Sequence, residues 1–111
     1  MWIVKWKLIV SLADPKPGLH FTQGSQLLRD LEEALQEVNA RWQGQREFEI
    51  LQVSHKDITL EFRSENAIKN KRSIQWYLQR VSILLNTDKQ WAARVTARPG
   101  RIFTIKECYE A

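Results

Sequence analysis

The sequence predicts an α+β fold of the ferredoxin-like, split βαβ type with one strand appended at the C-terminal end. Three observations predict it. Hydrophobic residues make up 43% of the chain and charged residues 27%, which is the balance of a globular protein. Segments with an apolar period of two and of about 3.6 follow one another in the order β-α-β-β-α-β-β. The 111 residues contain no repeat or linker, so we expect one domain, 1–111.

The ferredoxin-like arrangement places both helices on one face of an antiparallel sheet. The expected order of strands across this sheet is 4-1-3-2, with the fifth strand beside the fourth. A single core then forms between the sheet and the helices, and the other face of the sheet stays polar. The residues expected in this core are Trp6, Leu8, Leu31, Leu35, Leu78 and Val81.

The first strand is expected in residues 1 to 12, where apolar side chains alternate with polar ones. Lys5, Lys7 and Ser11 fall on the polar side. The apolar side consists of Trp2, Val4, Trp6, Leu8, Val10 and Leu12. Residues 13 to 24 contain two prolines and two glycines, and we expect them to be irregular.

The first helix is predicted from Ser25, as its N-cap, to about Trp42. Its apolar residues recur at three- and four-residue spacing and occupy about one third of the helical circumference. They are Leu27, Leu28, Leu31, Leu35, Val38 and Trp42. Glutamates on the remaining surface make the outer face acidic.

A hairpin is predicted next, from residues 48 to 54 and 57 to 62, with a turn near His55 and Lys56. The outward positions of its second strand would be Asp57, Thr59, Glu61 and Arg63. RNA-recognition motifs of this fold class stack bases on aromatic residues of their central strands. No aromatic residue stands at these positions, so we do not expect that type of RNA recognition.

The second helix is predicted to begin at Ser64 or Asn66 and to end near Asn86. Its apolar stripe consists of Ile74, Tyr77, Leu78, Val81, Leu84 and Leu85. Two strands are predicted after it, in residues 91 to 98 and 101 to 109, on either side of a Pro-Gly loop.

Positive charge is concentrated in the second half of the chain. Residues 1 to 55 contain six Lys and Arg against seven Asp and Glu, whereas residues 56 to 111 contain eleven against six. Within residues 66 to 106, nine basic residues are accompanied by a single acidic one, Asp88. Such a run either keeps exposed faces in water or forms an electrostatic footprint for a polyanion such as nucleic acid.

A helical projection of the second helix places Trp76 on the face opposite the apolar stripe. Lys69, Arg72 and Arg80 flank it on that face. An outward Trp among cations is found in sites that stack nucleic-acid bases and in hot spots of protein interfaces. Alternatively, Trp76 packs against a neighbouring loop, and the long cationic side chains cover it.

Few residues could carry catalysis or hold a metal. His20 lies in the irregular segment and His55 in the predicted turn, and neither has an Asp, Glu or Cys at a catalytic or metal-binding spacing. One cysteine, Cys108, and two histidines are too few for a Cys/His zinc site. Asp14 could hold a metal only if a partner chain supplied a second carboxylate. We therefore expect no enzyme activity, no cofactor and no metal.

Membrane association is not expected either. No apolar run approaches the length of about 20 residues that crosses a bilayer. The apolar start of the chain is interrupted by Lys5 and Lys7 and lacks a cleavage site of small residues. We expect a cytoplasmic protein.

Two functions fit these observations best. The first is a non-catalytic module that binds nucleic acid, RNA or DNA, mainly through phosphates contacted by the second helix and the C-terminal strands. The second is a protein-interaction or regulatory domain, such as an inhibitor, that binds an acidic protein surface. A dimeric nuclease or transferase has only fold-level analogy behind it, although the polar sheet face would allow a homodimer. The candidate binding residues are Lys69, Lys71, Arg72, Trp76, Arg80, Arg94, Arg98 and Arg101.

Overall fold

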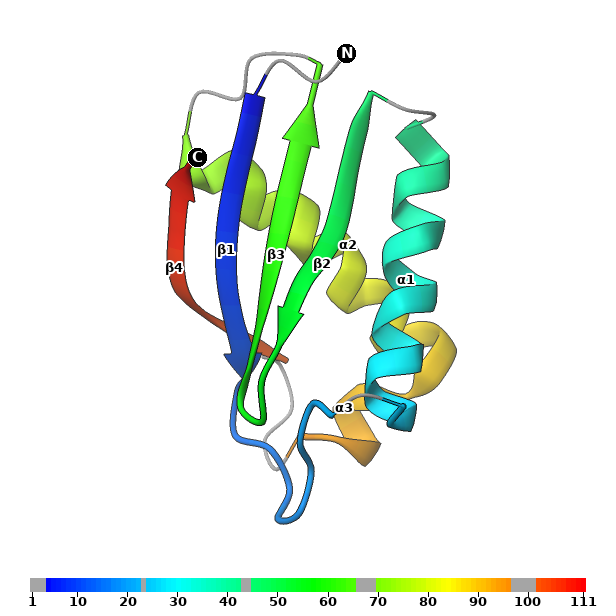
Figure 1. Cartoon of the computed structure of the whole chain (residues 1–111). Helices are drawn as coiled ribbons and strands as arrows, with labels where there is room; N and C mark the ends of the chain where they lie inside the picture. The colour runs from blue at the N-terminus through cyan, green and yellow to red at the C-terminus, as the bar shows by residue number, and fades with distance from the viewer. Residues whose placement is uncertain (1–3, 23, 43–44, 66–69, 97–101) are drawn as a thin grey trace.

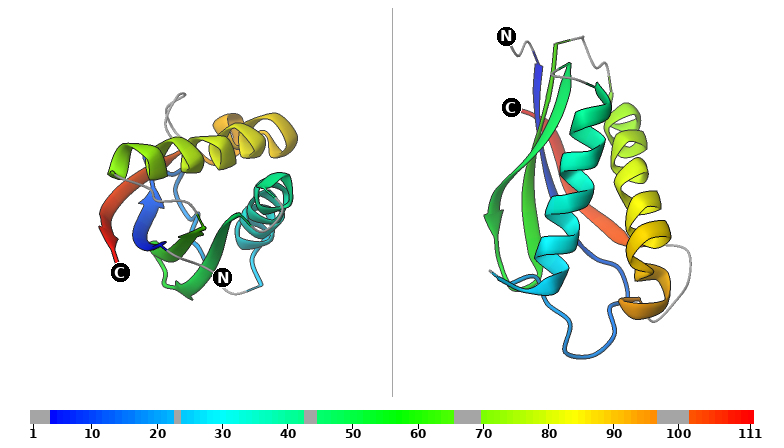
Figure 2. Two further views of the ribbon diagram at one scale, coloured as in Figure 1. Left: turned by 90° about the horizontal axis from the view of Figure 1, so that it is seen from above. Right: turned by 90° about the vertical axis from the view of Figure 1, so that its right-hand side faces the viewer.

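The computed structural model describes residues 4–22, 24–42, 45–65, 70–96 and 102–111. In these residues, two long helices cover one face of a four-stranded antiparallel sheet (Figure 1). Both helices lie on the same side of the sheet when the molecule is turned by 90° (Figure 2). The elements in chain order are β1 (Val4–Leu12), α1 (Gln26–Trp42), β2 (Arg46–Val53), β3 (Asp57–Ser64), α2 (Lys71–Lys89), α3 (Trp91–Arg94) and β4 (Phe103–Glu110).

The strands run in the order β2-β3-β1-β4 across the sheet, and every neighbouring pair is antiparallel. The edge beside β1 is formed by β4, whose residues were expected to form an appended fifth strand. The described part of the chain contains no fifth strand. The two central strands, β1 and β3, alternate as predicted, and Leu8 lies opposite Leu60 on the buried face.

The strand predicted in residues 91 to 98 is wrong, because α3 stands at its beginning. Gln90 ends α2 in the left-handed conformation, with φ 57°, and its carbonyl accepts the first hydrogen bonds of the new helical turn. Trp91 and Val95 are both buried, whereas Ala93 between them is exposed, and a strand would place all three side chains on one face. Thr96 then makes an isolated bridge with Pro15. The rest of this prediction, including the Pro-Gly loop, falls outside the described residues.

The two long helices begin at side-chain caps. The backbone N–H of Leu28 donates to Ser25 Oγ at 3.2 Å, which confirms Ser25 as the cap of α1. The predicted start of α2 at Ser64 is wrong, because Ser64 pairs within the sheet, and Asn66 lies outside the described residues. Instead, Asn70 caps α2 by accepting the N–H of Ser73 at 3.1 Å.

The core lies between the sheet and the helices, and it contains all six residues predicted for it: Trp6, Leu8, Leu31, Leu35, Leu78 and Val81. Two large residues join it that the sequence did not indicate. Phe21 comes from the irregular segment of residues 13 to 24, and Trp91 comes from α3. This segment is therefore fixed to the core, although it contains no regular element.

Candidate nucleic-acid interface

Trp76 lies on the outer face of α2, as the helical projection predicts. Its side chain is 50% exposed. The guanidinium carbon of Arg80, one turn further on, lies 4.4 Å from the centre of the Trp76 ring. Arg72, one turn before, is exposed on the same side of the helix. At this distance the cation interacts favourably with the ring quadrupole, so Arg80 holds the indole in place without burying it.

A group of aromatic rings supports Trp76 from below. Tyr77 is buried, and its ring meets the Trp76 ring edge to face at 5.0 Å between centres. Trp42, at the end of α1, contacts the Tyr77 ring at 4.8 Å, and the guanidinium carbon of Arg46 lies 4.9 Å from the same ring. Phe62 of β3 stacks on Tyr77 at 5.2 Å. Tyr77 is thus held by residues of α1, β2 and β3, so the ring against which Trp76 packs is fixed in position.

The contacts of Trp42 and Arg46 with Tyr77 cannot be predicted from the sequence. Trp42 is expected only as the last apolar residue of the first helix, and no role is predicted for Arg46. The sequence carries no signal for their contact with Tyr77, because they lie more than thirty positions away from it. The packing of α1 beside α2 brings them together.

A shallow hollow of about 330 Å³ adjoins Trp76 at the start of α2. Its lining consists of Asn70, Arg72, Ser73, Trp76 and Tyr77. The Asn70 carboxamide caps the helix by accepting the N–H of Ser73. Arg72 is the charged residue in the described lining of the hollow. A flat aromatic group that enters here meets an indole, and its negatively charged substituents meet a guanidinium. Lys71, the first residue of α2, is also exposed.

Arg94 lies apart from Trp76, beyond the other end of α2, and its role in binding stays a prediction. It lies in α3 rather than on a strand, and its guanidinium is 3.7 Å from the carboxylate of Asp30. It also donates to the carbonyl of Lys89 at 2.6 Å. Asp30 is buried and accepts the indole N–H of Trp91 at 3.0 Å. Arg94 therefore helps to hold α3 against α1. Lys69, Arg98 and Arg101 lie outside the described residues.

Other cations of the basic half are likewise paired with carboxylates. Lys89 Nζ lies 2.6 Å from Glu33, and this hydrogen bond raises the pKa of the lysine. Lys106 Nζ lies 3.0 Å from Asp57. Within the described residues, the uneven distribution of charge along the sequence therefore does not become one continuous patch in space. The described cations that remain exposed on α2 are Lys71, Arg72 and Arg80.

The open face of the sheet is a poor alternative site for nucleic acid. Arg63 of β3 lies 3.1 Å from Glu47 and 3.2 Å from Glu49, both on β2. Glu61 lies 3.7 Å from the same guanidinium. Three carboxylates thus surround one cation, and they repel phosphate.

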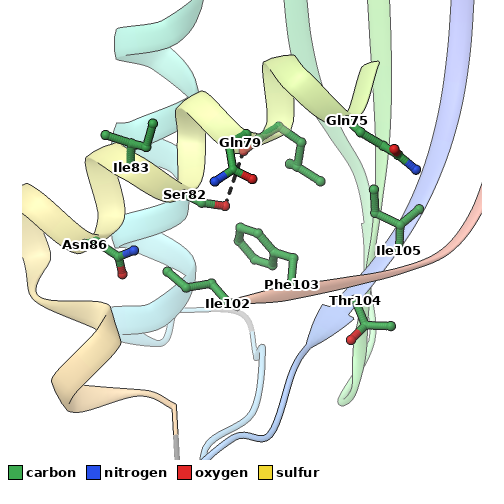
Figure 3. A pocket seen from close by; sticks show the side chains of 10 residues that line it. Gln75, Gln79, Ser82, Ile83, Asn86, Ile102, Phe103, Thr104 and Ile105 are labelled. Atoms are coloured by element: carbon green, nitrogen blue, oxygen red, sulfur yellow. Dashed lines mark hydrogen bonds between the residues drawn. The ribbon is translucent and has the colours of Figure 1, made fainter. Parts of the chain in front are cut away.

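A groove of about 520 Å³ separates α2 from the start of β4 (Figure 3). The side chains that line it on α2 include Gln75, Gln79 and Asn86, and Phe103 points into it from β4 (Figure 3). None of the lining residues is ionisable. The groove therefore offers hydrogen bonds but neither a general acid nor a general base.

Cys108 is buried on β4, and burial raises the pKa of its thiol despite the nearby Lys71. A protonated thiol is a weak nucleophile. Within the described residues, no three His, Cys, Asp or Glu side chains gather in a way that would hold a metal ion. No helix in this part of the chain is long and apolar enough to cross a membrane.

Comparisons of the chain with models of protein families, with curated proteins and with solved structures gave no match.

Proposed function

We propose that the chain is a non-catalytic module that binds single-stranded nucleic acid on the outer face of α2. One observation carries this proposal: a half-exposed Trp76 stands on a rigid aromatic base, between the exposed guanidinium groups of Arg72 and Arg80. Unpaired bases stack on such rings, and the cations beside them hold the phosphates. Paired bases cannot reach the ring, so we expect single strands to bind more tightly than duplexes.

The phosphate contacts in this proposal come from Lys71, Arg72 and Arg80. Lys69, Arg98 and Arg101 remain candidates from the sequence. Contacts of this kind position a strand but do not distinguish its bases. The module would therefore bind RNA or DNA with little sequence preference.

The test is fluorescence anisotropy with one labelled oligonucleotide, single-stranded and as a duplex, at about 50 mM salt, where nonspecific binding is strong. Trp76→Ala should weaken single-strand binding about tenfold, because stacking on an aromatic side chain contributes about 1–3 kcal/mol per base. Trp76→Phe should retain part of that affinity. Ile83→Ala is the matched control, since Ile83 is exposed to the same degree on α2 and offers no ring. Absence of binding to both oligonucleotides would refute the proposal.

A second function is supported by Ile83 itself. It is 49% exposed and lies two turns beyond Trp76 on the outer face of α2. An exposed Trp, an exposed Ile and two arginines also suit a helix that docks on an acidic protein surface. In that case Ile83→Ala and Trp76→Ala should both weaken binding of the protein partner, and no oligonucleotide should bind.

We also infer that the fold is of the ferredoxin-like, split βαβ type, without the appended strand. The support is the order β2-β3-β1-β4 with antiparallel neighbours, together with the position of both long helices on one face (Figure 2). A solved structure in which residues 97–101 add a strand to the sheet would contradict this inference.

A further inference from the structure

A second site of different character lies at the other end of the sheet. The irregular segment of residues 13 to 24 meets the β2–β3 turn there, at the bottom of Figure 1, whereas α2 begins near the top. A cavity of about 320 Å³ opens between the segment, the turn and the neighbouring ends of β1 and β4. His20 and Lys16 line it from the segment, and His55 and Lys56 line it from the turn. Lys106 of β4 completes its polar lining.

The two histidines stack on each other inside this lining. Their ring centres lie 3.7 Å apart, and the ring planes are inclined by 26°. They come from segments that are far apart in the sequence, so the fold itself builds the pair. Both rings belong to the cavity lining, where their nitrogens can hydrogen-bond to a ligand.

The charged groups around the histidine pair favour an anion. Lysines approach from three elements: Lys16 from the segment, Lys56 from the turn and Lys106 from β4. The carboxylate of Asp57 pairs with Lys106 at 3.0 Å. Lys16 Nζ donates to the carbonyl of Ala93 at 2.5 Å, which fixes its position. Apart from the two histidines, the ionisable residues of the described lining are all lysines.

The rest of the cavity wall is mostly apolar, apart from Ser11. Leu12, Pro15, Pro17 and Leu19 contribute to it. A cavity with cations on one side and aliphatic side chains on the other suits a small organic molecule with one strongly charged group. A bare inorganic ion would use only the charged side.

We propose that this cavity binds the phosphate group of a small phosphomonoester. The lysines and imidazoles contact the phosphate oxygens, and the aliphatic wall receives the organic part. This site is independent of the α2 face. Trp76→Ala should leave its affinity unchanged, so failure of one proposal does not affect the other.

The first experiment uses sulfate as the probe, because sulfate is a tetrahedral dianion like the phosphate group of a monoester. Sodium sulfate is titrated into the full chain at constant pH, with sodium chloride at matched ionic strength, and the ring resonances of His20 and His55 are followed by NMR. We expect saturable shifts of both rings, because both line the cavity. Shifts no larger than those caused by chloride would overturn the proposal.

Two variants test the lining residues. Lys56→Gln should weaken sulfate binding about tenfold, the effect of losing one hydrogen bond to a charged group. His55→Phe keeps a stacked ring but has no nitrogen to donate a hydrogen bond, so it should also weaken sulfate binding. Lys5→Gln is the matched control, since Lys5 is an exposed lysine of β1 that does not line the cavity, and it should bind sulfate like the unaltered chain. If Lys5→Gln weakened sulfate binding as much as Lys56→Gln does, the loss would come from net charge alone, and the proposed site would be contradicted.

The source of the phosphate is identified by competition at constant pH. Glycerol phosphate should displace sulfate more effectively than inorganic phosphate does, because only the ester reaches the aliphatic wall. A 5′-phosphorylated oligonucleotide should compete no better than the same oligonucleotide without the phosphate. Equal competition by inorganic phosphate and the ester would contradict a phosphomonoester site, and so would preference for the phosphorylated oligonucleotide.

Discussion

At the scale of single residues, Asp30 shows how one buried carboxylate connects three parts of the chain. Its side chain is almost fully buried in α1. It accepts hydrogen bonds from Gln26 at 2.7 Å and from the Trp91 indole at 3.0 Å, and Arg94 lies 3.7 Å away. Each carboxylate oxygen thus has a partner, which a buried charge requires.

Removal of this carboxylate should destabilise the fold strongly. Asp30→Ala leaves the Trp91 N–H buried without an acceptor, and breaking a buried charged network typically costs about 3 kcal/mol or more. Arg94→Ala should cost less than about 1 kcal/mol, because the exposed partner of an ion pair contributes little. Urea denaturation of the two variants measures the difference. Equal losses would mean that Arg94, rather than Trp91, is the important partner of Asp30.

At the scale of the elements, the sequence predicts best where one face of an element is uniformly apolar. β1, α1 and β3 follow from period and caps because their apolar stripes are unbroken. β2 follows from its β-rich residues, although its pairing with β3 shifts register after Ile50. The strand predicted at residue 91 is wrong because Trp91, Val95 and Thr96 favour strands by residue type, and the four-residue spacing of Trp91 and Val95 fits both a strand and a helix. The predicted start of α2 at Ser64 is wrong because Ser64, Asn66 and Asn70 can all cap a helix by residue type. Only the tertiary structure places Ser64 in the sheet.

The boundary between α2 and α3 gives a test of that helical assignment. Gln90 adopts φ 57°, and the left-handed region costs a non-glycine residue about 1–2 kcal/mol. Gln90→Gly should therefore raise the unfolding free energy by up to about 1 kcal/mol, once the greater entropy of the unfolded glycine is subtracted. Gln79→Gly is the matched control within α2 and should lower it by about 0.6 kcal/mol, from helix propensity. Thermal or urea unfolding measures both, and a loss at position 90 equal to that at 79 would contradict the left-handed junction.

At the scale of the whole molecule, the two candidate sites occupy opposite ends and use different chemistry. The α2 face combines an indole with guanidinium groups, whereas the cavity at the β2–β3 turn combines imidazoles with lysines. The sequence pointed to the first through Trp76 and its flanking arginines. The sequence could not indicate the second site, because the rings of His20 and His55 stack only when the irregular segment folds against the turn. Isolated histidines in loops carry no signal of a partner.

The salt dependence of nucleic-acid binding measures how many cations of the basic half act together. Each phosphate neutralised on a single strand contributes about −0.7 to the slope of log affinity against log salt. The described cations of the α2 face, with the three sequence candidates, make six contacts at most, so the slope should be no steeper than about −4. All nine basic residues of positions 66 to 106 would give about −6.

Variants separate these two outcomes. Arg72→Gln and Arg80→Gln should each reduce the slope by about 0.7. Lys89→Gln and Lys106→Gln should leave it unchanged, because Glu33 and Asp57 already neutralise those lysines. Oligonucleotide titrations at four salt concentrations between about 50 and 200 mM give each slope. If Lys89→Gln lowers the slope as much as Arg72→Gln does, then the ion pair with Glu33 opens on binding, and the nucleic acid follows the whole length of α2 rather than its first half.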